Sequence, residues 1–231
     1  MKEVSCDSCI SKNCFIQVCN DEKLFSFINE VKRTSFYRKK QHVVYEGEQV
    51  LGLYFILKGK IKVVSSGLFG KTQVVRLTQD GDIIGHRGYG GETYPISAIT
   101  LEDSEICFVD NDSIYTAFME NPKLAFEVMM YYSKELRNSE AKIKNLAQMS
   151  VCEKVVDSLL YAEKLYLNNE TISIQIDRQD LADLAGINTE QLSRVLSELK
   201  KEKILSLPKN EIIIHNRNQL LEIIEPFNIT Y

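Results

Sequence analysis

The chain has 231 residues, of which 44% are hydrophobic and 26% charged, and its formal net charge is −4. This length suffices for two modest domains with separate cores, and the composition is that of a soluble globular protein. No apolar run approaches the length of a membrane span, and the opening MKEVSCDSC lacks the apolar region of a signal peptide. We therefore expect a cytoplasmic protein with no membrane partner.

The cysteines gather near the start of the chain, at Cys6, Cys9, Cys14 and Cys19, whereas Cys107 and Cys152 stand alone. A secreted disulfide scaffold would spread its cysteines through a smaller chain, so we interpret residues 1–20 as a small cysteine-rich segment. The first four have the spacing of a zinc knuckle with Cys14 in place of its histidine, which would suit a tetrahedral zinc site. Alternatively, they are reduced thiols, and Cys107 is an ordinary buried cysteine.

Residues 21–121 are predicted to form the first domain. An amphipathic helix is expected over residues 21–34, and segments rich in β-branched and aromatic residues follow it. These segments are HVVYEGEQ, GLYFILKGKIKVVSS, TQVVRLTQDGDIIG and ISAITLEDSEICFVD. Their glycine punctuation predicts many short strands, which suggests a closed or rolled antiparallel sheet.

Residues 122–150 form the longest helix candidate, and Pro122 favours a helix start there. A heptad seam runs along it, in alternating steps of four and three residues. Its members are Ala125, Met129, Tyr132, Leu136, Ser139, Ile143, Leu146 and Ser150. Such a seam can pack on its own domain. A long uncharged seam between two domains is more typical of a two-fold interface, so we predict a dimerisation helix.

Residues 151–231 are predicted to form a winged helix-turn-helix. The stretch DRQDLADLAGINTEQLSRVLSELKKEKIL starts at Asp177 and holds two helical patterns separated by Gly186, which allows a sharp turn. Asn188 or Thr189 is expected to cap the second helix, and ILSLPKNEIIIH predicts the hairpin that forms the wing. The expected fold class is α+β, with an antiparallel β-roll, a long dimerisation helix and a winged helix-turn-helix in that order.

The outward face of the second helix carries side chains that can contact base edges in a major groove: Thr189, Glu190, Gln191, Ser193 and Arg194. Residues 173–205 contain five basic and six acidic side chains, so binding to random DNA should be weak. The alternative is a ligand-sensing or metal-binding module whose helix pair makes protein contacts. We expect no enzyme, because none of the three histidines adjoins a nucleophile motif and the sequence has no glycine-rich phosphate loop.

This order of elements resembles the Crp/Fnr family of bacterial transcription regulators. EGEQVLGLYFILKGKIKVV and GDIIG are similar to that family's sensor roll, and Glu190-x-x-Ser193-Arg194 matches the recognition motif of its Fnr-like branch. The resemblance implies that these three residues contact bases of a TTGAT-type half-site, and Arg194 can indeed pair with guanine. It further implies a homodimer on a palindromic site in double-stranded DNA, with RNA polymerase as a partner if the protein activates transcription.

The resemblance also indicates where an effector would bind. Cyclic-nucleotide-binding relatives have a glutamate after the glycine of GDIIG-like turns and an arginine before a Ser-Ala pair, and these positions are His86 and Ile96 here. Because the partners of the ribose and the phosphate are both absent, cyclic AMP is not expected. Another effector would meet His86, Arg87 and Ser97. The alternative is an empty roll on which Arg87 is merely solvated.

Oxygen-sensing Fnr proteins hold a four-iron four-sulfur (4Fe-4S) cluster on three N-terminal cysteines and one distant cysteine, and thiolates suit such a cluster. Cys6, Cys9 and Cys14 resemble the first three, with one residue fewer between Cys9 and Cys14, and Cys107 lies where the family places the fourth. The resemblance therefore implies a cluster on these four residues, with Cys19 as the alternative fourth ligand. Zinc and a metal-free segment are the competing interpretations.

Overall fold

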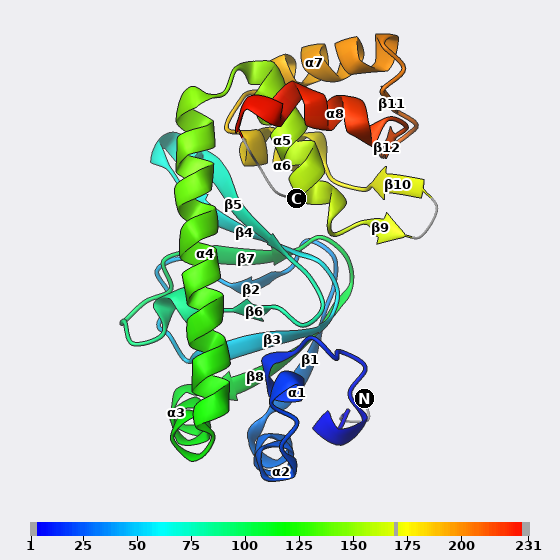
Figure 1. Cartoon of the computed structure of the whole chain (residues 1–231). Helices are drawn as coiled ribbons and strands as arrows, with labels where there is room; N and C mark the ends of the chain where they lie inside the picture. Colours follow the sequence, from blue (N-terminus) through cyan, green and yellow to red (C-terminus); the bar gives the residue numbers. More distant parts are fainter. Residues whose placement is uncertain (1–3, 169–170, 228–231) are drawn as a thin grey trace. The chain divides into compact units, whose positions relative to one another are not determined.

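The computed structural model describes residues 4–168 and 171–227 (Figure 1). The chain divides into two compact units, and we describe each by itself. The first comprises Met1–Lys71 and Val75–Leu136, and the second comprises Thr72–Val74 and Arg137–Tyr231. No helix among the described residues combines the length and apolar character needed to cross a membrane.

The first unit opens with three short helical elements, η1 (Cys6–Ser8), α1 (Phe15–Cys19) and α2 (Glu22–Val31). The Asp21 carboxylate accepts hydrogen bonds from two backbone N–H groups at the start of α2, which fixes where that helix begins. Cys6, Ile16 and Cys19 are buried in one core cluster with α2 and the roll. The cysteine-rich segment is therefore packed into the first unit rather than appended to it.

The predicted antiparallel roll is confirmed. One sheet has the order β1-β8-β3-β6 and the other the order β2-β7-β4-β5, and the assigned pairs are antiparallel. The strands are β1 (Arg33–Tyr37), β2 (His42–Val44), β3 (Gly52–Lys58), β4 (Ile61–Ser66), β5 (Thr72–Thr78), β6 (Ile83–Ile84), β7 (Ser97–Thr100) and β8 (Ser104–Asp110). Side chains of both sheets fill the roll with an apolar core, because alternate residues along a strand point to opposite faces.

Two 3-10 turns and two helices follow: η2 (Leu68–Gly70), η3 (His86–Gly88), α3 (Asn111–Glu120) and α4 (Pro122–Gln148). The first unit includes α4 as far as Leu136. Leu124 and Val128 are buried in the core that α4 shares with α1, α2 and the roll. Several apolar side chains on α4 remain exposed. They include four members of the predicted seam: Met129, Tyr132, Leu136 and Ile143.

The long helix ends earlier than the seam predicts. α4 stops at Gln148, and Ser150 is the N-cap of the next helix, α5 (Val151–Glu163). The Ser150 hydroxyl accepts from the Glu153 N–H while the Glu153 carboxylate accepts from the Ser150 N–H, which forms a capping box. Ser150 is therefore not a member of the α4 seam.

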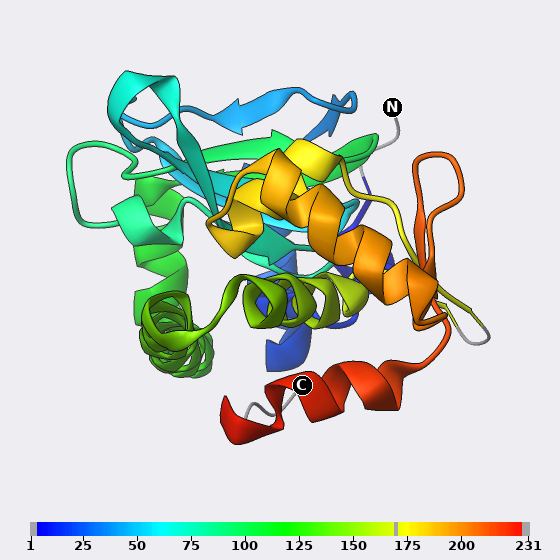
Figure 2. The same cartoon turned by 90° about the horizontal axis from the view of Figure 1, so that it is seen from above.

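The second unit continues from α5 with a small sheet and a helix pair. Its further elements are β9 (Leu167–Asn168), β10 (Thr171–Ile174), α6 (Arg178–Ala185), α7 (Thr189–Lys201), β11 (Leu205–Ser206), β12 (Ile212–Ile214), α8 (Arg217–Ile224) and η4 (Glu225–Phe227). The sheet order is β11-β12-β10-β9, and β11 pairs antiparallel with β12 as the hairpin predicted for the wing. Figure 2 shows α6 and α7 crossing, with this hairpin beyond the end of α7.

Candidate nucleic-acid interface and cysteine site

The turn between α6 and α7 follows from two local features. Gly186 has a φ of +66°, in the left-handed region that glycine adopts without a steric penalty, and it ends α6. Asn188 then caps α7, because its side chain accepts from the Gln191 N–H at 2.8 Å and its N–H donates to the Gln191 amide oxygen at 3.3 Å. Gln191, which the sequence placed among the base contacts, is thus engaged in the cap.

The other predicted base-contacting residues lie on the exposed side of α7. The side chain of Glu190 is 83% exposed and that of Arg194 is 68% exposed. Their charged groups are 3.4 Å apart, one helical turn from each other. The Ser193 hydroxyl donates to the Thr189 carbonyl at 2.8 Å and remains at the surface. On the opposite side of the helix, Leu192, Val195, Leu196 and Leu199 are buried. The sequence thus assigned the two faces of α7 correctly.

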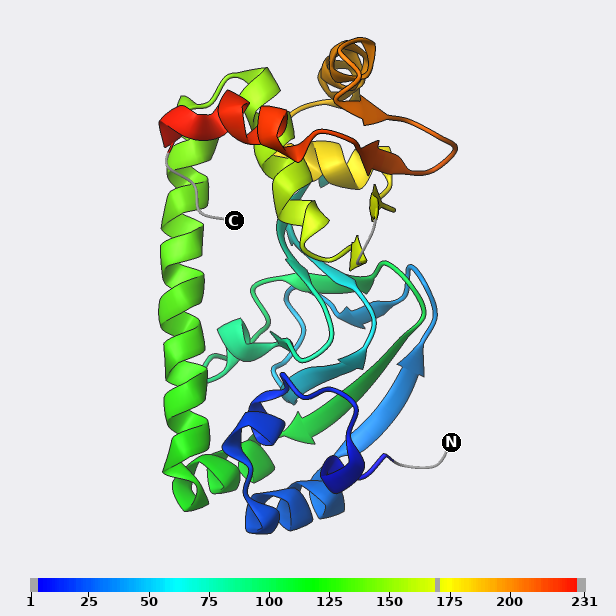
Figure 3. The same ribbon diagram turned by 45° about the vertical axis from the view of Figure 1, so that its right-hand side comes forward.

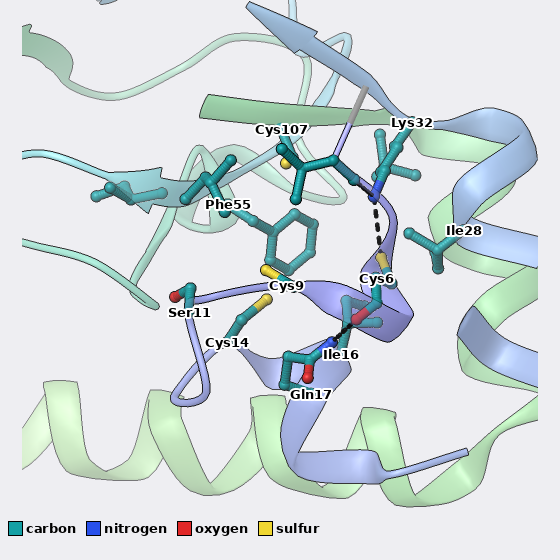
Figure 4. Close-up of a pocket in the computed structure, with 14 residues that line it drawn as sticks. Cys6, Cys9, Ser11, Cys14, Ile16, Gln17, Ile28, Lys32, Phe55 and Cys107 are labelled. Atoms are coloured by element: carbon teal, nitrogen blue, oxygen red, sulfur yellow. Dashed lines mark hydrogen bonds between the residues drawn. The ribbon is translucent and has the colours of Figure 1, made fainter. Parts of the chain in front are cut away.

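The described cysteines are all free thiols, and four of them line one pocket of the first unit (Figure 4). Cys6, Cys9 and Cys14 come from the N-terminal segment, and Cys107 comes from β8. The remaining walls are largely apolar and include Ile28 and Phe55. In this arrangement no group of three or more described His, Cys, Asp or Glu side chains is close enough to hold a metal ion.

Cys19 does not line this pocket. It lies at the end of α1, and the charged groups that act on its thiol are Lys123, Glu127 and Asp21 rather than other cysteines. The cysteines that line the pocket are therefore the predicted four with Cys107 as the fourth. The alternative fourth cysteine, Cys19, lies outside the pocket.

The environment of the pocket favours the protonated form of three of its thiols. Burial raises the pKa of Cys14 to about 12, and burial also raises the pKa values of Cys6 and Cys107. Metal ligation requires thiolates, so loading this site would release protons. Four cysteines that line one pocket have the residue type and the grouping that a thiolate-bound iron–sulfur cluster needs. Their thiols would have to move closer together to ligate such a cluster.

The three residues predicted for an effector pocket have different neighbours in the structure. His86 is buried, with its ring edge-on to Tyr131 and Tyr132 of α4. Arg87 lies 3.3 Å from the Glu135 carboxylate. The Ser97 hydroxyl instead accepts from the backbone N–H of Glu46 at 2.9 Å. His86 and Arg87 therefore contact α4, whereas Ser97 bonds to the backbone of the roll at Glu46.

His86 is held as a neutral ring. Burial lowers its pKa to about 3, and the positive charges of Arg76 and Arg87 act in the same direction. The neighbouring Arg76 is also buried, and it pairs with Glu135 at 3.0 Å. These charged groups join the turn η3 and strand β5 to α4.

Sequence reasoning predicts no functional role for Arg76, Asn29 or Lys32. Arg76 occupies a position in TQVVRLT at which the alternation of the strand expects a buried residue. Lys32 follows the buried Ile28 of α2 by four residues. In both cases the sequence signal that could have identified the residue is a charge at a position where the amphipathic pattern expects an apolar side chain. Asn29 and Lys32 prove to contact the cysteine segment directly.

The comparisons with known proteins agree with this architecture. Residues 34–121 match the family model of the cyclic nucleotide-binding domain, and residues 153–223 match that of the Crp-like helix-turn-helix domain. The "Anaerobic regulatory protein" of Pasteurella multocida is 26% identical over 225 residues, which are 95% of this chain and 82% of that protein. The "Fumarate and nitrate reduction regulatory protein" of Vibrio cholerae is 25% identical, covering 95% of this chain and 90% of that protein.

Solved structures share the fold. FixK2 from Bradyrhizobium japonicum has a TM-score of 0.76 at 23% identity, covering 84% of this chain and 97% of that one. The c-di-GMP responsive regulator CLP of Xanthomonas campestris has a TM-score of 0.75 at 18% identity, covering 84% and 99%. With a cyclic nucleotide-binding-like roll and a DNA-binding helix-turn-helix both matched in this order, the chain belongs to the Crp/Fnr family of transcription regulators.

Proposed function

We propose that this protein binds a palindromic DNA operator as a homodimer and that an iron–sulfur cluster in the cysteine pocket controls the binding. The observation that carries the sensing part is the convergence of Cys6, Cys9, Cys14 and Cys107 on one pocket while Cys19 lies outside it. Relatives that share about a quarter of its residues are named for anaerobic regulation, which supports a response to oxygen.

The exposed face of α7 supports the DNA-binding part. Glu190, Ser193 and Arg194 project from one side of a helix whose other side is buried, as expected of a helix that enters a major groove. The Arg194 guanidinium can donate two hydrogen bonds to a guanine, and the Glu190 carboxylate can accept from a cytosine amine. In free protein the two groups pair with each other, so DNA binding would exchange that surface ion pair for base contacts.

The exposed apolar side chains of α4 support the dimer. Phe126, Met129, Met130, Leu136 and Ile143 leave much of their surface in water, an unusual concentration for one helix. Two copies paired along this helix would cover these side chains and place one recognition helix on each half-site.

A direct contact links the cysteine segment to α4. Cys14 is the N-cap of α1, and the adjacent Phe15 packs its ring edge-on against Tyr131 of α4, with 5.1 Å between ring centroids. Ligation by Cys14 would therefore fix a residue whose neighbour touches the proposed dimerisation helix. A bound cluster would supply the sensitivity to oxygen, and the residue next to Cys14, Phe15, contacts α4.

Binding to a TTGAT-N4-ATCAA duplex, compared with a scrambled duplex by fluorescence anisotropy, tests the operator. Arg194→Ala should cost about 1–3 kcal/mol on the specific duplex alone, because it removes a base contact. Lys201→Ala is the matched control: it removes a positive charge from the last turn of α7, and the loss of a charge that does not read sequence should weaken both duplexes alike. Equal binding of the two duplexes by the wild-type protein would contradict the proposal.

Anaerobic purification, with iron, sulfide and zinc analysis and a visible absorption spectrum, tests the sensor. We expect iron and sulfide in the wild-type protein, and their loss in serine variants of Cys6, Cys9, Cys14 and Cys107. Cys19→Ser and Cys152→Ser should retain the cluster. Zinc that disappears with Cys19→Ser would instead identify a zinc knuckle.

A further inference from the structure

The pocket that the four thiols share contains one buried positive charge. Lys32 follows the last residue of α2 and is only 7% exposed. Its ammonium group donates to the Val4 carbonyl oxygen at 2.6 Å and lies 3.1 Å from the sulfur of Cys6 (Figure 4). Lys32 thus reaches the same space as the candidate ligands.

This charge has no carboxylate partner within 4 Å in the described part of the chain. Lys32 acts electrostatically on the Asp7 carboxylate, which is exposed to solvent. A buried ammonium without a counter-charge is costly. The other described side chains that line the pocket are thiols, a hydroxyl, an amide and apolar groups. They offer Lys32 hydrogen-bond acceptors but no carboxylate.

Asn29 precedes Lys32 by about one helical turn on α2, and its side chain contacts the segment that carries Cys6. Its side-chain oxygen accepts from the Cys6 N–H at 2.8 Å, and its amide nitrogen donates to the Ser5 hydroxyl at 2.9 Å. The amide of Gln17 also donates to the Cys6 carbonyl. Figure 3 shows the segment lying beside α2 at one end of the roll. The loop that carries Cys6 is therefore fixed so that its sulfur faces the ammonium.

We propose that Lys32 is the counter-cation of the cysteine site and stabilises the negative charge of a thiolate-bound cluster, without ligating it. This inference rests on the proposed function, because it assigns a role to a residue beside the proposed cluster. Lys32 is a positioning residue whose influence is electrostatic. The net charge around a cluster and the hydrogen bonds to its sulfurs are established determinants of its reduction potential.

The direction of the effect follows from charge. Adding an electron makes a thiolate-bound cluster more negative, so a nearby cation favours the reduced form over the oxidised form. Lys32→Met keeps much of the side-chain length and removes the charge. At a fixed potential we expect the ratio of reduced to oxidised cluster to fall by about tenfold, which equals about 59 mV for a one-electron couple. The cluster should also lose its visible absorbance faster in air.

Three further variants separate charge from structure. Lys32→Arg retains the positive charge and should restore the wild-type potential. Asn29→Asp adds a negative charge beside Cys6 and should shift the potential in the same direction as Lys32→Met. Lys123→Met is the matched control, since Lys123 donates to the Val18 and Cys19 carbonyls of the same segment but lies outside the pocket. It should leave the potential unchanged.

The measurements are iron and sulfide content, the midpoint potential by spectroelectrochemical titration, and the rate of absorbance loss in air, all on anaerobically purified full-length protein. A wild-type protein without iron would overturn the proposed function, and the inference with it. Iron in the wild-type protein, with one potential shared by the wild type, Lys32→Met and Asn29→Asp, would overturn the inference alone. A loss of cluster in Lys32→Met that Lys32→Arg restores would support the inference, even if the uncharged variant were too unstable to titrate.

Discussion

A single charge on the exposed side of α4 should separate the proposed dimer. Leu136 is 63% exposed in one chain and stands in the middle of the predicted seam. Full burial of a leucine side chain is worth about 1.5–3 kcal/mol, so covering this exposed part contributes about 1–2 kcal/mol per chain and about 2–4 kcal/mol per dimer. Leu136→Glu forfeits this contribution and sets two carboxylates against each other across the two-fold axis.

Each 1.4 kcal/mol changes the dissociation constant tenfold, so the dimer should weaken by at least about 30-fold and up to about 1,000-fold. Sedimentation equilibrium over a concentration series measures this change directly, and operator binding should weaken with it. Asn138→Glu introduces the same charge two residues further along, outside the seam, and should leave the association constant unchanged. A Leu136→Glu protein as dimeric as the wild type, or a control that dissociates equally, would refute the assignment of this face.

Three other changes have expected outcomes. Glu163 is 1% exposed, and both of its carboxylate oxygens accept from the Nε of Arg217, which is 38% exposed. Arg217→Met should therefore lower the free energy of unfolding by about 3 kcal/mol in urea denaturation, and Glu163→Gln by less, because it leaves no charge buried. His86 has a folded-state pKa of about 3 against 6.5 in the unfolded chain, so the unfolded state takes up a proton first as the pH falls. Stability should be complete above pH 6.5 and be lost toward pH 3 by up to about 1.4 kcal/mol per pH unit, a slope that His86→Phe should reduce in acid denaturation. Ser150→Ala removes half of the capping box and should cost about 1 kcal/mol, measured by thermal unfolding.

The sequence was most informative where periodicity and turn chemistry agreed. The pattern from Asp177 onward predicts both helices of the pair, the Gly186 turn and the outward face of α7, because each of these features is local. Ser150 shows how two local signals can compete. It fits the step of the heptad seam, but it also begins the sequence SVCE, whose serine and glutamate can cap each other. In the structure the cap prevails, and the long helix ends before it.

The candidate site depended on contacts that spacing does not encode. Cys107 lies on β8, far along the chain from Cys14, so only the resemblance to Fnr proteins associated the two residues. Lys32 and Arg76 were overlooked because a charged side chain usually indicates a solvated position. The roll and its helices bury both of them. The place of His86 after a glycine predicts a contact with an effector, and it does not encode the packing of the ring on α4.

The ion pair on α7 has a consequence for how quickly the protein finds a target. While Glu190 neutralises Arg194, the surface offered to random DNA carries little net charge. Sliding along a duplex depends on a sustained attraction to phosphates, which grows with the number of cations presented. This protein should therefore make brief visits to random DNA and sample a genome mainly by repeated three-dimensional encounters. Its search time should then depend on how many copies the cell contains, more than on the length of DNA that flanks each operator.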